Sequence, residues 1–244
     1  MDRAHHSWHS PRLGRQMSIL EYGHYGYPLV VFPTSLGNES EYPDREMIEA
    51  IGDPIENGRL KVFCVNSVNG DSWASETAHP RHMSWLQAQY DDYLTRELAP
   101  FIHQQCRTPG IPITTTGCSM GAYHAVNSVL KHPDLFRRAI AMSGAYDVRG
   151  FMQGGEYDDN AYFNNPVDYV RNLSDPWYLS QLAHCEIRLA TGNGPWEDSG
   201  PSYALAAVLG AKGIPNWVDN WGSAGGHDWP YWKTMIREYV ARMF

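Results

Sequence analysis

The sequence predicts an α/β fold in which a mostly parallel central sheet is flanked by helices. Short continuous apolar or β-branched runs, such as Pro28–Phe32 and Ile113–Thr116, are typical of strands buried on both faces. Between such runs lie segments with apolar residues at helical spacing, of which about Ser84–His103 is the longest. This alternation is typical of helices packed on a parallel sheet. At 244 residues, the chain is long enough for one large domain of this kind.

The N-terminal half begins with residues 1–15, where Trp8 and Pro11 favour an irregular arm laid over the domain. Pro43 falls in the first turn of an expected helix, a position that proline tolerates well. The remaining elements follow from their apolar patterns. They are strands at Met17–Tyr22, Pro28–Phe32 and Leu60–Val65, a helix at Tyr42–Ile51, a polar loop at Asn66–Ser75, and the long helix over about Ser84–His103.

The C-terminal half repeats the strand and helix alternation, with His132-Pro133 ending the first helix. Expected strands are Ile113–Thr116, Arg138–Ser143, Cys185–Ala190 and Asn216–Trp221, and later helices are Ser202–Ala211 and Tyr231–Met243. Residues 148–184 differ, because they are rich in Asn, Asp and aromatic residues. We expect a single domain over residues 1–244 with 148–184 as a small cap-like insertion. That segment is too polar and short for a strongly hydrophobic lid, which disfavours a lipase acting at oil–water surfaces.

Composition excludes several classes of partner. The formal net charge of −8 argues against nucleic acid and anionic membrane surfaces. No segment approaches the length needed to span a bilayer, and the N-terminus lacks the apolar core of a signal peptide, so a cytoplasmic location is the expectation. The expected partner is a small-molecule ester substrate, and homo-oligomerisation is left open.

Cysteine and histidine patterns favour structural roles over metal or redox chemistry. The four cysteines are widely spaced and are expected to be free thiols: Cys64, Cys106, Cys118 and Cys185. The spacing of His5 and His9 would align them on a helix, so a metal site there is an alternative, but no carboxylate or cysteine joins them nearby. No metal and no cofactor is expected.

The most informative stretch is the Gly-x-Ser-x-Gly motif at Gly117–Gly121. It follows a β-branched run and opens a helix with small residues, Ala122 and Ala125, on its inner face. This strand–turn–helix context is the one in which such a motif presents a nucleophile. The two glycines remove side chains that would collide in the tight turn. Ser119 is therefore the candidate nucleophile, at a helix N-terminus that favours developing negative charge.

Small residues also follow the earlier buried strand, in the loop Pro33–Asn38. This is the position that supplies one backbone N–H of an oxyanion hole, with Ser35 and Leu36 as candidates. The second N–H belongs to Met120, which follows the candidate nucleophile.

Two later loops supply an acid and a base. Glu197 and Asp198 come after the strand Cys185–Ala190, and His227 lies in a Gly-rich loop after the strand Asn216–Trp221. The order Ser, acid, His is that of α/β-hydrolases and not of chymotrypsin-like or subtilisin-like proteases. His124 is a poor alternative base, because side chains on its helix point back along the axis and not over Ser119.

These pieces resemble the putative-esterase branch of the α/β-hydrolases, which includes esterase D (S-formylglutathione hydrolase), feruloyl esterases and mycolyltransferases. The matching segments are Pro33–Gly37, Gly117–Gly121, Gly192–Glu197 and His227–Trp232. The resemblance implies an α/β-hydrolase fold with Ser119 as nucleophile, Glu197 as acid and His227 as base. It also implies an oxyanion hole formed by the N–H groups of Leu36 and Met120. Asp198 remains the alternative acid.

The expected activity is a serine carboxylesterase that hydrolyses small to medium soluble esters through an acyl-enzyme. An acyltransferase or thioesterase with the same triad is one alternative, and a non-catalytic carbohydrate- or aromatic-binding module is another. Four residues are expected to contact the substrate: Ser35, Trp73, Trp177 and Trp229.

Overall fold

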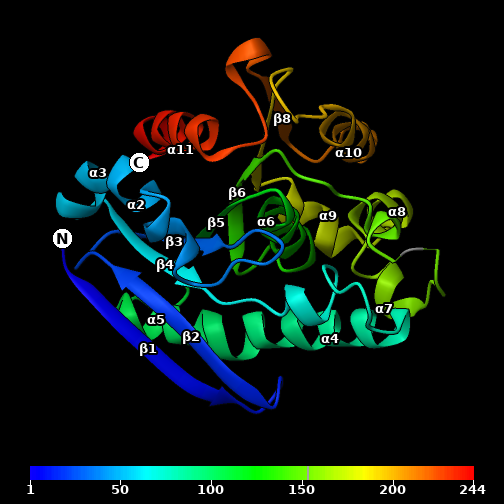
Figure 1. Ribbon diagram of the computed structural model, residues 1–244, viewed down its shortest axis with the longest axis horizontal. Coiled ribbons are helices and arrows are strands. Elements are labelled where there is room, and N and C mark those ends of the chain that lie inside the picture. Colours follow the sequence, from blue (N-terminus) through cyan, green and yellow to red (C-terminus); the bar gives the residue numbers. More distant parts are fainter. Residues whose placement is uncertain (153) are drawn as a thin grey trace.

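The computed structural model describes residues 1–152 and 154–244 and contains an eight-stranded sheet in the order β1-β2-β4-β3-β5-β6-β7-β8 (Figure 1). The strands are β1 (Arg3–Ser10), β2 (Arg15–Tyr22), β3 (Tyr27–Phe32), β4 (Leu60–Val65), β5 (Ile113–Cys118), β6 (Phe136–Met142), β7 (Glu186–Thr191) and β8 (Asn216–Asn220). β1 and β2 pair antiparallel, as do β2 and β4, whereas β4, β3 and β5–β8 form a parallel series. The predicted α/β-hydrolase fold with a mostly parallel sheet is confirmed.

Helices cover both faces of this sheet. They are α1 (Glu41–Asp44), α2 (Met47–Ala50), α3 (Gly52–Glu56), α4 (Pro80–Tyr93), α5 (Ala99–Gln105), α6 (Met120–Lys131), α7 (Asp159–Tyr162), α8 (Pro166–Asn172), α9 (Pro176–Leu182), α10 (Gly200–Ala211) and α11 (Trp229–Met243). Short 3-10 turns lie at Asn69–Asp71, Val148–Gly150 and Gly222–Ala224. No helix in the described ranges combines the length and the apolarity needed to cross a membrane.

Two apolar cores lie on opposite faces of the sheet, because neighbouring strand residues point to opposite sides. Val30 packs in the core shared with α4, α5, α6 and α10, whereas Val31 packs in the core shared with α1–α3 and α11. The central strands are buried along most of their length, as continuous apolar runs predict. Because β3, β5, β6 and β7 are parallel, their carboxyl ends lie along one edge of the sheet.

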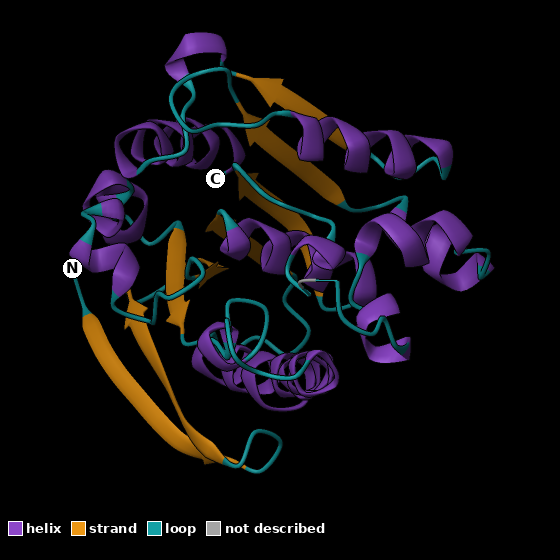
Figure 2. Ribbon diagram, turned by 45° about the vertical axis from the view of Figure 1, so that its right-hand side comes forward, coloured by secondary structure: helices purple, strands orange, loops and turns teal. Residues whose placement is uncertain are grey.

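The N-terminal segment corrects one prediction. Residues 1–15 are not an irregular arm, because β1 forms a long hairpin with β2 at the outer edge of the molecule (Figure 2). Glu97 fixes this hairpin: it accepts hydrogen bonds from Trp8 Nε1 and Ser10 Oγ, both at 2.8 Å. Glu97 lies in a five-residue π-helical turn, Leu94–Leu98, that joins α4 to α5.

Two further segments differ in detail from the sequence expectation. The helix expected at Tyr42–Ile51 is divided into short turns, because Glu46 has a left-handed φ of 57°. Residues 148–184 connect β6 to β7 and form three short helices, α7, α8 and α9. α7 contacts α4 and α8 contacts α10, so this segment is held against the helices of one face of the sheet.

Candidate active site

Ser119 stands alone at the turn between β5 and α6, with φ 55° and ψ −120°. Backbone strain of this kind costs about 1–3 kcal/mol and clusters at functional sites. The flanking glycines permit the turn: a Cβ on Gly117 would overlap the backbone of Gly121, and a Cβ on Gly121 would overlap the carbonyl oxygen of Phe32. The tight turn therefore projects the Ser119 side chain and also brings α6 against the end of β3.

Two segments that approach each other at Gly121, the start of α6 and the loop after β3, carry backbone N–H groups without a protein partner in the part of the chain that the structure describes. Among the described residues, neither the Met120 N–H at the start of α6 nor the N–H groups of Ser35 and Leu36 have a protein acceptor. Glu41 holds the second segment in place, accepting hydrogen bonds from Thr34 N at 2.8 Å and Thr34 Oγ1 at 2.6 Å. Unpaired donors on a fixed loop and at a helix N-terminus are suited to binding an oxyanion.

Glu197 is the carboxylate that faces His227. Its side chain is only 1% exposed, and Oε2 lies 3.7 Å from His227 Nδ1. Oε1 accepts a hydrogen bond from Thr191 Oγ1 at 2.8 Å, whereas Oε2 has no hydrogen-bond partner among the described residues. A buried carboxylate oxygen without a partner is costly, so the Nδ1–H of the imidazole beside it is the donor that can satisfy this oxygen.

Asp198 has a different environment. It is exposed, and its Oδ1 accepts a hydrogen bond at 2.9 Å from Gly200 N at the start of α10. The adjacent Trp196 has a left-handed φ of 63°, which turns the chain so that Glu197 points inward. The structure brings Glu197, and not Asp198, into contact with His227.

The loops carrying the acid and the base are joined by backbone hydrogen bonds. Asn193 N donates to Gly222 O and Gly194 N to Gly225 O, both at 2.7 Å, and His227 N donates to Pro195 O at 2.9 Å. The distance between the carboxylate and the imidazole is therefore set mainly by the backbone.

His227 is linked through Trp232 to the end of β6, the strand next to the one that leads into Ser119. Its ring meets Trp232 edge-on at 5.1 Å, and Trp232 Nε1 donates to Ser143 Oγ at 2.8 Å. Ser143 follows β6, and Ser119 N donates to Met142 O at 2.9 Å, so the two serines lie on neighbouring strand ends. The described residues show no direct Ser119–His227 hydrogen bond, and such bonds are often loose in unliganded sites.

Burial lowers the pKa of His227 below its usual value, while the negative charges of Glu197 and Asp228 act in the opposite direction. The imidazole is therefore held in the neutral form that can accept a proton near neutral pH. His124 is unlike it: burial lowers its pKa to about 3, and its Nε2 is 2.7 Å from Asn69 Oδ1. His124 is thus a neutral core residue.

Other candidates are placed as follows. Burial raises the pKa of the Cys118 thiol, which lies beneath the turn, well above its usual value. All four cysteines are free, and no cluster of three or more metal-binding side chains occurs in the described chain. His6 lies 3.0 Å from Glu21, and His5 and His9 are exposed on strand β1.

The three tryptophans expected to contact the substrate lie in different parts of the structure. Trp73 is buried in the core, where its Nε1 donates to Tyr123 OH at 3.2 Å, so it has no free surface for a ligand. Trp177 is exposed on α9, on the segment that leads into the opposite end of β7. Trp229 meets Trp232 edge-on at 5.0 Å, and Trp232 in turn meets the His227 ring.

Three supporting residues were missed by the sequence reasoning: Thr191, Trp232 and Glu41. Thr191 is the last residue of the strand before the acid loop, so its position was a usable signal. Trp232 belongs to the motif that was recognised, but its hydrogen bond to Ser143 depends on packing between β6 and α11. The bonds from Thr34 to Glu41 depend on the path of the loop and leave no sequence pattern.

Three features together are typical of an α/β-hydrolase. They are a strained serine after β5, a buried acid after β7 and a histidine after β8. The family model described as “Putative esterase” matches residues 31–243, and the chain belongs to that family. The resemblance noted in the sequence is therefore confirmed, and membership supports a hydrolase of the ester-cleaving class.

Similar structures agree on the fold. A ferulic acid esterase superposes with a TM-score of 0.75 at 17% identity, covering 100% of this chain and 99% of that one. S-formylglutathione hydrolase from Staphylococcus aureus gives a TM-score of 0.70 at 17% identity, with 99% and 96% covered. MPT51 from Mycobacterium tuberculosis gives 0.70 at 13% identity, with 100% and 98% covered.

The chain is also similar to part of a longer curated protein. Serine O-succinyltransferase from Xanthomonas oryzae pv. oryzae is 26% identical over 152 residues, which is 54% of this chain. The match covers only 38% of the length of that relative.

Proposed function

We propose that this chain is a serine carboxylesterase acting on small to medium soluble esters through Ser119, His227 and Glu197. The observation that carries the proposal is the buried Glu197 carboxylate 3.7 Å from His227 Nδ1, on loops fixed over the strand end next to Ser119. Family membership supports the ester-cleaving class.

The reaction proceeds in two balanced halves. Ser119 Oγ attacks the ester carbonyl carbon while His227 Nε2 takes the hydroxyl proton, and the carbonyl oxygen becomes an oxyanion. The N–H groups of Met120 and Leu36 donate to that oxygen, each stabilising the transition state by roughly 3–4 kcal/mol. Collapse expels the alcohol, which receives the proton from His227. Water then repeats the sequence on the acyl-enzyme and releases the acid.

Glu197 acts through the imidazole. Its charge fixes the tautomer in which Nδ1 carries the proton and stabilises the imidazolium formed in each half-reaction. Thr191 holds the second carboxylate oxygen and so orients the acid. Trp229, two residues after the base, and Ser35, in the loop after β3, are the residues that we expect to contact substrate.

An acyltransferase is the second candidate, favoured by the match to serine O-succinyltransferase. In an acyltransferase, an alcohol replaces water as the acceptor of the acyl group. If the acyl donor is a thioester, the first half-reaction is the same as that of a thioesterase. A non-catalytic binding module is disfavoured, because it would require no buried acid beside the base.

Hydrolysis of p-nitrophenyl esters of increasing acyl length, comparing the unmodified protein with Ser119→Ala, tests the esterase. Short-chain hydrolysis that disappears in the variant supports the proposal, and hydrolysis that survives overturns the assignment of Ser119. A parallel assay with succinyl thioester and L-serine asks whether O-succinylserine forms, which would favour the transferase.

A further inference from the structure

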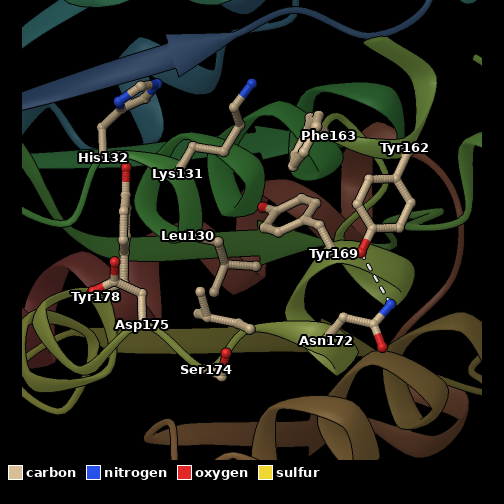
Figure 3. A pocket seen from close by; sticks show the side chains of 11 residues that line it. Leu130, Lys131, His132, Tyr162, Phe163, Tyr169, Asn172, Ser174, Asp175 and Tyr178 are labelled. Carbon is tan, nitrogen blue, oxygen red and sulfur yellow. Dashed lines mark hydrogen bonds between the residues drawn. The ribbon is translucent and has the colours of Figure 1, made fainter. Parts of the chain in front are cut away.

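A cavity lies far from Ser119, at the opposite end of α6. It measures about 380 Å³ and is lined by residues from the end of α6, from α7 and α8, and from the segment leading into α9 (Figure 3). Because α6 has 12 residues, its far end is about 18 Å from the serine turn. The cavity is therefore separate from the catalytic edge of the sheet, and the ester chemistry makes no use of it.

Four aromatic rings, three of tyrosine and one of phenylalanine, stand in its walls. Tyr178 stands on one side and Tyr162 and Tyr169 on the other, with Leu130 between them (Figure 3). Two rings are held by hydrogen bonds of their hydroxyl groups: Tyr169 OH donates to an Asn127 side chain at 2.8 Å, and Tyr162 OH accepts from Asn172 Nδ2 at 2.9 Å. The walls are thus preorganised, which reduces the entropy lost on binding.

Phe163 completes the aromatic lining and opens it to solvent. Its ring meets Tyr162 edge-on at 5.0 Å and is 57% exposed. An exposed phenylalanine beside three tyrosines leaves π surface that no protein group covers. Ring faces carry partial negative charge and attract cations.

The cavity also has a negative charge in its wall, which would attract a cation. Asp175 lines it, and its Oδ1 accepts from the N–H groups of Trp177 and Tyr178, while Oδ2 has no hydrogen-bond partner in the described chain. Of the two basic lining residues, Lys131 forms an ion pair, with Nζ 2.8 Å from the carboxylate of Asp91, and His132 Nε2 lies 2.9 Å from the same carboxylate. Both side chains point away from Ser174 and Asp175 (Figure 3).

We propose that this cavity binds a small alkylammonium group, with the four aromatic rings surrounding the cation and Asp175 as its counter-charge. The volume suits a head group with several methyl substituents and a short chain. Anionic and neutral ligands of the same shape are attracted neither by the faces of the aromatic rings nor by the carboxylate of Asp175.

Calorimetric titration with choline, its neutral isostere 3,3-dimethylbutan-1-ol, and benzoate tests the proposal on the full chain. Choline should bind about tenfold more tightly than the alcohol, the ratio expected for one to two kcal/mol of cation–π attraction. Equal binding of choline and the alcohol, tighter binding of benzoate, or no choline binding up to about 20 mM would each overturn the cation assignment.

Matched variants locate the binding. Tyr178→Leu should weaken choline binding at least fivefold, whereas Tyr178→Phe retains the ring and should bind like the unmodified protein. Asp175→Asn keeps a capping oxygen for α9 and should weaken binding about threefold. Asp53→Asn, an exposed change on the distant α3, is the control. Circular dichroism and ester hydrolysis report folding, and equal losses in all four variants would refute the site.

Discussion

Replacing Glu197 by glutamine is the sharpest test of the proposed triad, because the chain offers a matched control at the next position. Glu197→Gln preserves size and removes the charge beside His227, while Asp198→Asn removes the same charge from an exposed side chain that caps α10. Each variant exchanges one carboxylate for a carboxamide of the same length, so the two differ in which carboxylate is lost.

The expected loss follows from the distance between the two side chains. Two unit charges 3.7 Å apart attract by about 4 kcal/mol at an effective dielectric constant of 20. This dielectric constant is appropriate because one third of the His227 side chain is exposed to screening solvent. The imidazolium exists only along the reaction path, so the attraction stabilises the transition state and not the free enzyme. Glu197→Gln should therefore lower kcat about 1,000-fold, and Asp198→Asn less than about threefold.

The assay is the dependence of kcat and KM on pH for a short p-nitrophenyl ester. Burial lowers the pKa of His227, and the charge of Glu197 opposes that shift. The acid limb of kcat/KM should therefore fall below about pH 6.5 in the unmodified protein, and it should move to lower pH in Glu197→Gln. KM should change little, because neither carboxylate is expected to touch the substrate.

Two outcomes would refute the reasoning. If Asp198→Asn loses activity while Glu197→Gln retains it, the acid is Asp198 and the loop must rearrange during catalysis. If both variants retain activity, His227 works without a carboxylate. Unfolding midpoints of both variants show whether a loss of rate is a loss of folded protein.

Further predictions concern the turn and the core. Gly121→Ala should abolish activity, because the new methyl group would overlap the end of β3. Gly210→Ala is the control: its methyl group has free space, so activity should be kept and stability should rise by about 0.5–1 kcal/mol. Ester hydrolysis and urea unfolding check both variants. Trp73→Ala should lower the free energy of unfolding by about 3–5 kcal/mol as a core change, and a shift in KM with unchanged stability would contradict that placement. Burial lowers the pKa of His124 to about 3, so the unfolded state binds more protons than the folded state below about pH 6.5. The free energy of unfolding should therefore decrease as the pH is lowered from about 6.5 to about 3, by up to 1.4 kcal/mol per pH unit. His124→Gln should flatten this slope in unfolding measured as a function of pH.

The sequence was most informative where chemistry is local. The spacing of Gly117 and Gly121 around Ser119 is dictated by the turn itself, so the motif could be recognised without the tertiary structure. The order of strands and helices was predictable for the same reason, because apolar periodicity depends on near neighbours. The choice between Glu197 and Asp198 was not, since adjacent side chains point in opposite directions according to the backbone angle of Trp196.

Long-range contacts explain the predictions that were wrong. The first strand was mistaken for an irregular arm although it pairs with the neighbouring β2, and the bonds that anchor it, from Trp8 and Ser10 to Glu97, span more than 80 residues. Trp73 was expected in the binding site because it ends a polar loop, but the loop folds inward and its indole reaches Tyr123 on α6. Neither contact leaves a pattern in the neighbouring residues.

The surroundings of the proposed triad bear on the choice between water and an alcohol as acyl acceptor. A transferase must keep water from the acyl-enzyme, because water is far more concentrated than any acceptor. Here the base is one third exposed, and the rim residues Leu36 and Trp196 are 81% and 89% exposed. The cap-like segment carrying α7, α8 and α9 is held by α4 and α10 at the side of the domain. An opening of this kind favours hydrolysis, and efficient transfer would require an acceptor that itself covers the exposed rim.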